Sequence, residues 1–250
     1  MALDGKDGDN PGTAAGLFVT TYWSVVLQAS RQELPEAAEA LEKLCRLYWY
    51  PLYAYVRRRG YRPEDAQDLT QAFFAHLLSK DFLRGVRPEK GRFRSFLLTC
   101  LQHFLADEWE RAHTAKRGGA RPEILLDWAE AENRYRLDAL VEPNPESLYE
   151  RRWAIGLLDH ALDRLRTEAV AGGKQAVFDQ LQCCLLGERT TETYAQLGAR
   201  LGLSESAVKV TVHRLRQRYR ELLREQIAHT VTRPEEIEEE IHYLFEVVSR

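Results

Sequence analysis

Apolar residues recur at steps of three and four along almost the whole chain, and no stretch of useful length alternates apolar with polar residues. Steps of three and four bring side chains to one face of an α-helix, whereas a half-buried strand requires a period of two. Glycine and proline residues interrupt the pattern and divide it into separate segments. We therefore predict an all-α fold in which helices bury their apolar faces against one another.

The segment from Thr193 to Arg220, which begins TYAQLGARLGLSESAVKVTVHRLRQRY, has the pattern of a helix-turn-helix. Gly202 permits a sharp turn between the two helices. Ser204 is suited to cap the second helix, because its side-chain oxygen can accept a hydrogen bond from the first turn. Gly198 is small and allows a close helix crossing, and Leu203 is predicted to fill the angle between the helices.

The second helix of this segment carries two stripes of different character. The apolar stripe consists of Val208, Val212, Leu215, Tyr219 and Leu222. The basic stripe, about 100° round the helix, consists of Lys209, His213, Arg216 and Arg220. Such a helix can dock in the major groove of double-stranded DNA, with its first residues at base edges and its later arginines at phosphates. The alternative is an amphipathic surface helix whose arginines are merely solvated; the turn, the small residue and the spacing together favour DNA.

Positive charge is local, although the formal net charge of the whole chain is −3. One basic run lies within residues 111–121 and a second within residues 209–224, while residues 123–150 and 235–246 are acidic. This distribution favours contact with phosphates at two defined patches over a general coating of DNA.

The remaining composition excludes several classes of protein. None of the cysteines, Cys45, Cys100, Cys183 and Cys184, has metal-ligand spacing, so we interpret them as core thiols in a reducing cytoplasm. The chain has neither a secretory signal pattern nor a run of roughly 20 apolar residues that would span a bilayer. Histidines are scattered, and no nucleophile elbow or phosphate loop is present. We expect no enzyme activity, no metal and no cofactor.

Glycine and proline clusters and shifts in charge predict two small helical domains, joined by an acidic linker and followed by a helical extension. The predicted boundaries are a disordered lead-in at 1–16, a first domain at 17–118, a linker at 119–147, a second domain with the helix-turn-helix at 148–225, and an acidic C-terminal helix at 226–250. The linker has room for a short helix near residues 125–135.

Three segments together resemble bacterial sigma factors of the sigma-70 family, of the extracytoplasmic-function type. RPEDAQDLTQAFFAHLL is similar to the helix by which these factors grip the polymerase clamp. FRSFLLTCLQHFLADEWERAHTAKR is similar to the helices that open and read the minus-10 element, and the helix-turn-helix is similar to their minus-35 reading domain. TTYWSVVL, near the N-terminus, resembles a segment found in a subgroup that also has a C-terminal extension.

The resemblance implies a non-enzymatic protein that binds core RNA polymerase and directs it to chosen promoters. The first domain would be the region 2-like unit, which binds the polymerase clamp and melts the minus-10 element, and the second domain would be the region 4-like unit. The implied minus-35 contacts are Ser204, Glu205, Ser206, Lys209, Val210, His213, Arg214 and Arg216. An anti-sigma factor or another regulator is an implied further partner.

The implied minus-10 contacts lie on the loop Arg84–Phe93 and on the helix after it. They are Arg92, Arg94, His103, Arg111, Lys116 and Arg117. His103 stands where the family commonly has Asn, and it could also be an ordinary structural histidine. Trp109 could stack on a base or pack in the core.

The implied polymerase contacts are Asp65, Asp68, Leu69, Gln71 and Phe74. Carboxylates on such a helix suit a basic partner surface, but they are also favoured at a helix N-terminus by the helix dipole alone. Ala72 stands where the family commonly has Glu, so one clamp contact could be missing.

Two questions remain open at this stage. The glutamates Glu235, Glu236, Glu238, Glu239 and Glu240 could cover a basic DNA-reading face, or the last helix could simply pack on its own domain. The chain could also be a stand-alone helix-turn-helix regulator, which would not need the clamp-like and minus-10-like segments. An all-helical scaffold is a more distant alternative that predicts no salt-dependent binding of DNA.

Overall fold

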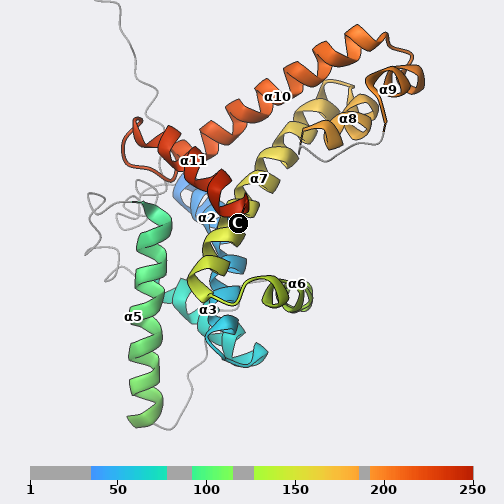
Figure 1. Cartoon of the computed structure of the whole chain (residues 1–250). Coiled ribbons are helices and arrows are strands. Elements are labelled where there is room, and N and C mark those ends of the chain that lie inside the picture. Colours follow the sequence, from blue (N-terminus) through green and yellow to red (C-terminus); the bar gives the residue numbers. More distant parts are fainter. Residues whose placement is uncertain (1–34, 78–91, 115–126, 186–191, 250) are drawn as a thin grey trace, which may run out of the picture.

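The computed structural model describes residues 35–77, 92–114, 127–185 and 192–249 (Figure 1). The described residues form helices and connecting segments without a strand, which confirms the predicted all-α class. None of these helices is long and apolar enough to cross a membrane. The elements are α2 (Pro35–Arg58), α3 (Pro63–Leu77), α5 (Phe93–Thr114), α6 (Trp128–Val141), α7 (Pro145–Ala171), α8 (Gln175–Leu181), the 3₁₀ helix η2 (Gln182–Cys184), α9 (Tyr194–Leu201), α10 (Glu205–Ala228) and α11 (Glu236–Ser249).

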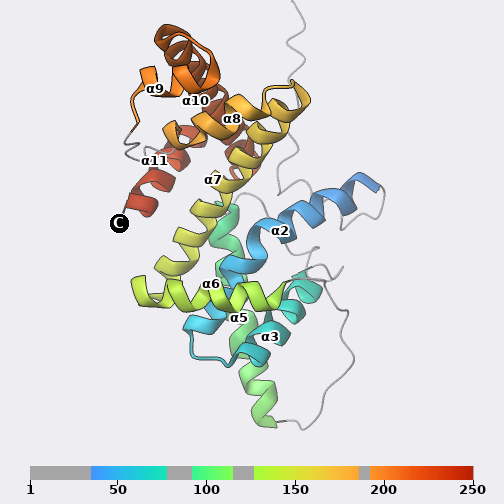
Figure 2. The same cartoon turned by 90° about the vertical axis from the view of Figure 1, so that its right-hand side faces the viewer.

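Helix α7 runs through the middle of the molecule and contacts both the N-terminal and the C-terminal helices (Figures 1 and 2). It has 27 residues, which corresponds to a length of about 40 Å. Asn144 caps it by accepting a hydrogen bond from the Ser147 amide at 2.9 Å, and Pro145 occupies its first turn. Its first half packs on α2, while α10 lies along its second half (Figure 1).

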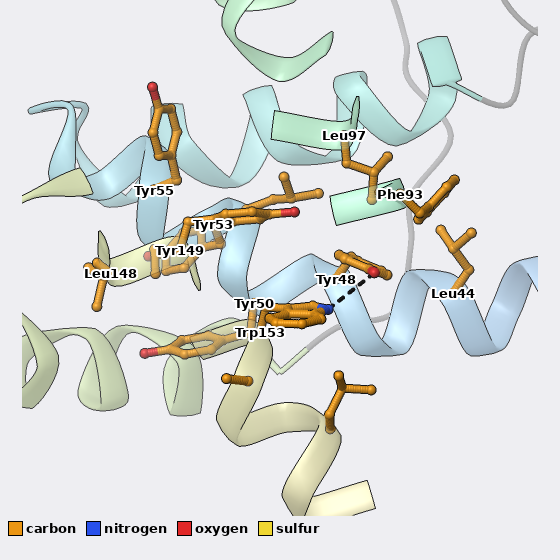
Figure 3. Packing of buried hydrophobic residues seen from close by; sticks show 14 of the residues in the cluster. Leu44, Tyr48, Tyr50, Tyr53, Tyr55, Phe93, Leu97, Leu148, Tyr149 and Trp153 are labelled. Carbon is orange, nitrogen blue, oxygen red and sulfur yellow. Dashed lines mark hydrogen bonds between the residues drawn. The ribbon is translucent and has the colours of Figure 1, made fainter. Parts of the chain in front are cut away.

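The main core is rich in aromatic side chains from α2, α5 and α7 (Figure 3). Trp153 is fully buried, and its Nε1 donates a hydrogen bond to the Tyr48 hydroxyl at 3.2 Å. The ring of Tyr48 in turn meets the ring of Phe93 edge-on, at 5.6 Å between centroids. Tyr149 donates a hydrogen bond from its hydroxyl to the Arg94 carbonyl at 2.9 Å. Polar tips of large aromatic residues thus find partners inside the core, as burial requires.

Helix α2 continues through Pro51, where the sequence predicts a kink or a break. A break does not occur, although proline lacks the amide that would continue the hydrogen-bond ladder. Tyr48 and Leu52, on either side of the proline, are fully buried. Packing of these flanking side chains outweighs the local cost, because tertiary burial supplies most of the stability of a helix in a protein.

Part of the segment predicted as a linker is helix α6, which packs across α2 (Figure 2). Glu132 of α6 accepts hydrogen bonds from the Tyr53 hydroxyl at 2.7 Å and from two nitrogens of Arg57, each at 2.8 Å. The buried Asp138, one turn and a half further on, accepts a hydrogen bond from the Tyr50 hydroxyl. The division of the chain into two domains stays a prediction, but residues 128–141 lie against the first set of helices.

The Glu132 carboxylate should make folding stability depend on pH. Its pKa is lowered, chiefly by the hydrogen bond from Arg57. A lowered pKa in the folded state means that the stabilisation is present above the unfolded value of about 4.3 and is lost as the pH falls through the folded value. We expect Glu132→Gln to cost about 2 kcal/mol near neutral pH and to show a shallower loss of stability in acid.

Urea unfolding measured from neutral pH down through the carboxylate range tests this prediction. Glu130→Gln is the matched control, because Glu130 is an exposed carboxylate on the same helix. An equal acid dependence in the wild type and in Glu132→Gln would contradict it.

Candidate nucleic-acid interface

Helices α9 and α10 form the predicted helix-turn-helix at the end of the molecule remote from α3 (Figure 1). Thr193 and Gln196 form a capping box at the start of α9. Gly202 ends α9 in the left-handed region, at φ 66°. Ser204 caps α10 by accepting a hydrogen bond from the Ala207 amide at 3.2 Å. The turn and the cap are therefore confirmed.

Four residues of the predicted apolar stripe of α10 are buried, and the fifth, Leu215, is half-buried. Val208 and Val212 share a small core with Leu181, Cys184 and Leu197, which come from α8, η2 and α9. Further along α10, the stripe enters the main core. The C-terminal part of α10 is thereby held on α7 while its first turns project with α9 (Figure 1).

Leu203 does not fill the angle between the helices, so that part of the prediction is wrong. Its side chain is 36% exposed and borders a cavity of about 410 Å³ between α7, α8 and α10. Its backbone occupies the crossing instead, since a Cβ added at Gly198 would lie 2.6 Å from the Leu203 carbonyl oxygen. Gly198 is therefore required by the turn rather than by the second helix.

Every residue predicted to contact the minus-35 element is exposed. Lys209 forms an ion pair with Glu205 across one turn of α10, at 2.6 Å. Arg216 donates two hydrogen bonds to the Cys184 carbonyl oxygen, at 2.7 and 3.2 Å, and so ties α10 to η2. Arg214 lies on the other side of the helix, at the edge of the cavity beside Leu203.

Helix α5 exposes part of the predicted minus-10 surface. His103 is exposed, and Trp109 is 59% exposed, so neither side chain is a core residue. Arg111 is exposed and pairs with Glu108 at 2.8 Å. Lys116, Arg117 and residues 84–91 of the predicted loop lie outside the described residues.

A cavity of about 450 Å³ lies beside Trp109, between α5 and the end of α2. Its wall includes Tyr55, Arg59, Tyr61 and Gln102. The Gln102 amide donates a hydrogen bond to the Tyr55 hydroxyl at 3.1 Å. The cavity thus combines aromatic rings, an amide and a cation next to an exposed indole, which is a suitable set for an unstacked base.

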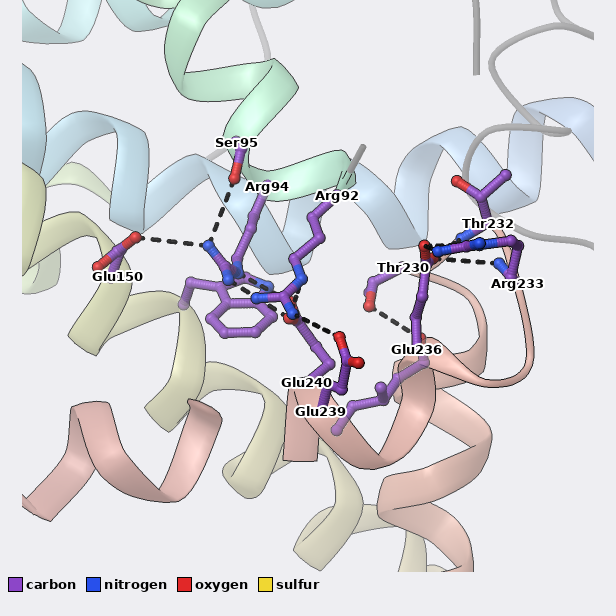
Figure 4. A network of polar contacts seen from close by, with 12 residues as sticks. Arg92, Arg94, Ser95, Glu150, Thr230, Thr232, Arg233, Glu236, Glu239 and Glu240 are labelled. Carbon is purple, nitrogen blue, oxygen red and sulfur yellow. Dashed lines mark hydrogen bonds and ion pairs between the residues drawn. The ribbon is translucent and has the colours of Figure 1, made fainter. Parts of the chain in front are cut away.

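Arg92 and Arg94, also predicted to contact the minus-10 element, bind the last helix instead (Figure 4). Arg94 is only 4% exposed, and its Nε lies 2.8 Å from an oxygen of Glu240. Its guanidinium stacks on the rings of Tyr243 and Trp153, at 4.2 and 4.9 Å from their centroids. Arg92 pairs with the other oxygen of Glu240 at 2.9 Å. The last helix therefore covers the Arg94 side chain in this structure, and contact of these two arginines with the minus-10 element stays a prediction.

The predicted polymerase-binding face of α3 is only partly at the surface. Asp68 is exposed, and Asp65 accepts a hydrogen bond from Arg62 at 3.0 Å. Leu69 and Gln71 are half-buried. Phe74 is 0% exposed and lies 6.0 Å from the ring of Phe73, so its side chain belongs to the core rather than to this face.

The last helix packs on α7 and α10, as the packing alternative expected. Its Glu238 pairs with Arg224 of α10, but the residues predicted to contact the DNA groove remain exposed. Sequence reasoning missed the role of Glu240. A weak signal was present, because Glu240 stands between Ile237 and Leu244 at the helical spacing of the buried stripe.

A family model described as Sigma-70 region 2 matches residues 46–114, which span the second half of α2, α3 and α5. The match supports a sigma factor of the sigma-70 family, a class of non-enzymatic transcription initiation factors that bind RNA polymerase and recognise promoters. No curated protein and no solved structure matches the chain.

The turn geometry makes Gly198→Ala a sharp test of the helix-turn-helix. The added Cβ meets a backbone oxygen at 2.6 Å and cannot be accommodated without moving the turn. We expect a loss of stability of about 1–3 kcal/mol, measured by thermal or urea unfolding. Gly156→Ala in α7 is the control, since its Cβ would lie 3.6 Å from the Leu47 side chain, an ordinary contact. That variant should be neutral or more stable by up to about 1 kcal/mol, and equal destabilisation by both changes would refute the argument.

Proposed function

We propose that this protein is a sigma factor of the extracytoplasmic-function type, which binds core RNA polymerase in the cytoplasm and directs it to promoters with defined minus-10 and minus-35 elements. The observation that carries this proposal is the combination of two parts in one chain. Residues 46–114 match sigma-70 region 2, and a capped helix-turn-helix with an exposed basic helix follows at Tyr194–Ala228.

Helix α10 would read the minus-35 element as duplex DNA. Ser206 is exposed in its first turn, and Lys209 and His213 are exposed in the two turns that follow. Side chains at the N-terminal end of a recognition helix reach base edges in the major groove. Arg214 and Arg216, further along, would contact phosphates, which contribute affinity without sequence information. The modest basic face of α10 is sufficient because the minus-10 contacts and the polymerase contribute the remaining affinity.

Helix α5 would bind the minus-10 element after the strands separate. Taking a base out of the stack costs a few kcal/mol, and stacking on an aromatic side chain returns about 1–3 kcal/mol. Trp109 and the adjacent cavity offer such a surface, and His103 is exposed on the same helix. Arg111 would contribute a phosphate contact.

Substitution of Trp109 tests the single-strand surface. Trp109→Ala should weaken binding of a fluorescein-labelled single-stranded DNA about tenfold, because one stacking interaction is removed. Trp109→Phe should retain most of the affinity, since an aromatic face remains. Fluorescence anisotropy measures both, and circular dichroism checks that the fold is unchanged. Equal affinity of Trp109→Ala and the wild type would contradict the stacking role.

The carboxylates of α3 would contact a basic surface of the polymerase. The exposed Asp68 is the best single test, and Asp68→Lys should weaken binding to immobilised core RNA polymerase about tenfold or more, because it places like charges together. Asp163→Lys, at an exposed position on α7, makes the same change of charge away from α3 and should bind normally.

This experiment also separates the proposal from its main alternative. A stand-alone helix-turn-helix regulator would not form a stable complex with core polymerase, whatever the state of Asp68. Promoter-specific transcription from core polymerase plus the purified protein would exclude that alternative, and absence of a polymerase complex with the wild type would overturn our proposal.

A further inference from the structure

The contact between α11 and the start of α5 buries an ionised group that the fold does not otherwise need. Glu240 is 0% exposed and binds Arg92 and Arg94 with its two carboxylate oxygens. The segment before α11 adds a backbone link, since the Phe93 amide donates a hydrogen bond to the Thr230 carbonyl at 3.2 Å. The C-terminal segment therefore contacts three consecutive residues at the start of α5: Phe93 through its backbone, and Arg92 and Arg94 through their side chains, which Figure 4 shows.

Stability alone is a poor explanation for this buried contact. Removing a carboxylate and a guanidinium from water costs free energy, and their attraction offsets this cost only when the geometry is good. A protein with an apolar pair of similar size in place of a buried ion pair is often as stable. Elsewhere on α11, Leu244 and Val247 are buried against the core, and the ion pairs of Glu238 and Glu239 lie at the surface. A charged residue in this stripe therefore suggests a role for Glu240 that leucine would not perform.

The arrangement of the arginines points to that role. A pair of guanidinium groups that holds a carboxylate through parallel hydrogen bonds is also suited to hold a phosphate. Arg92 and Arg94 lie directly after the loop that is predicted to hold the minus-10 strand. The carboxylate of Glu240 occupies the position in which a backbone phosphate of that strand would bind these arginines.

We propose that α11 is a displaceable cover, in which Glu240 competes with a phosphate of single-stranded DNA for Arg92 and Arg94. This inference rests on the proposed function, because it concerns regulation of the same minus-10 surface. It differs from a cover over the helix-turn-helix, whose groove-contacting residues stay exposed. Because α11 follows α10 in the chain, any movement of α10 away from α5 would also pull Thr230 from Phe93 and separate Arg92 and Arg94 from Glu240. Arg94 would keep one weaker partner, Glu150 of α7, at 3.4 Å.

Glu240→Gln tests the competition directly, since it removes the charge and keeps the size of the side chain. The free full-length variant should bind a fluorescein-labelled mixed-sequence single-stranded DNA about fivefold to tenfold more tightly than the wild type at low salt. The slope of log affinity against log salt should steepen by about 0.7 for each arginine released. Glu235→Gln is the control, because it makes the same change of net charge at an exposed position just before α11. Equal or weaker binding by Glu240→Gln relative to this control would overturn the cover.

A second measurement on the wild type does not depend on how the variant folds. Hydrogen exchange of residues 236–249 should accelerate when saturating single-stranded DNA is added, because DNA displaces α11. Unchanged or slower exchange would show a permanent structural helix and overturn the proposal. Binding of the same proteins to core polymerase separates the two ideas. If the wild type fails to bind polymerase, the proposed function is overturned. The effect of Glu240→Gln on the affinity for single-stranded DNA still tests whether α11 is a displaceable cover.

Discussion

Burial of α7 against α2 is the interaction on which both ends of the molecule depend. Trp153 fills the core beneath Tyr48, and the same helix continues to the place where α10 packs. Because one rigid helix packs on both α2 and α10, it fixes the position of these two helices relative to each other more firmly than a loop would. The orientation of the helix-turn-helix relative to the helices that match region 2 is therefore set by packing, and α11, which packs on both α7 and α10, strengthens that arrangement.

Charged residues in this protein have two separate uses. Some link distant segments away from solvent, as the half-buried Glu132 does for Arg57 and the buried Glu240 does for Arg94. Others stay at the surface of α10 and α5, where solvent and ligands reach them. The small net charge of −3 conceals this division. Net charge is a poor guide to the affinity of a protein for nucleic acid. The better guide is the set of exposed cations that have no buried ion-pair partner, because only these can replace the counterions of the phosphates.

Much of the local structure could be predicted, because its signals are local. Helical periodicity, the cap at Ser204 and the turn at Gly202 depend on residues within one or two turns of each other. The site was less predictable. Phe74 and Arg94 each fit the sequence pattern of a binding surface, yet both are buried. The Leu203 side chain is predicted to fill the angle between α9 and α10, but the backbone of Leu203 lies there instead. In each case the identity of the residue allowed either environment, and long-range packing chose between them.

The sequence was enough to predict that the chain is helical and where its helix-turn-helix lies, and three of its segments resemble parts of a promoter-binding factor. Which cations are exposed and which are covered became clear from the tertiary structure alone. Local structure and burial depend on interactions of different range along the chain. A helix pattern repeats every three or four residues, whereas Arg94 meets its carboxylate partner Glu240 across 146 residues of chain. No local pattern encodes that meeting, and it follows from the way α7, α10 and α11 pack.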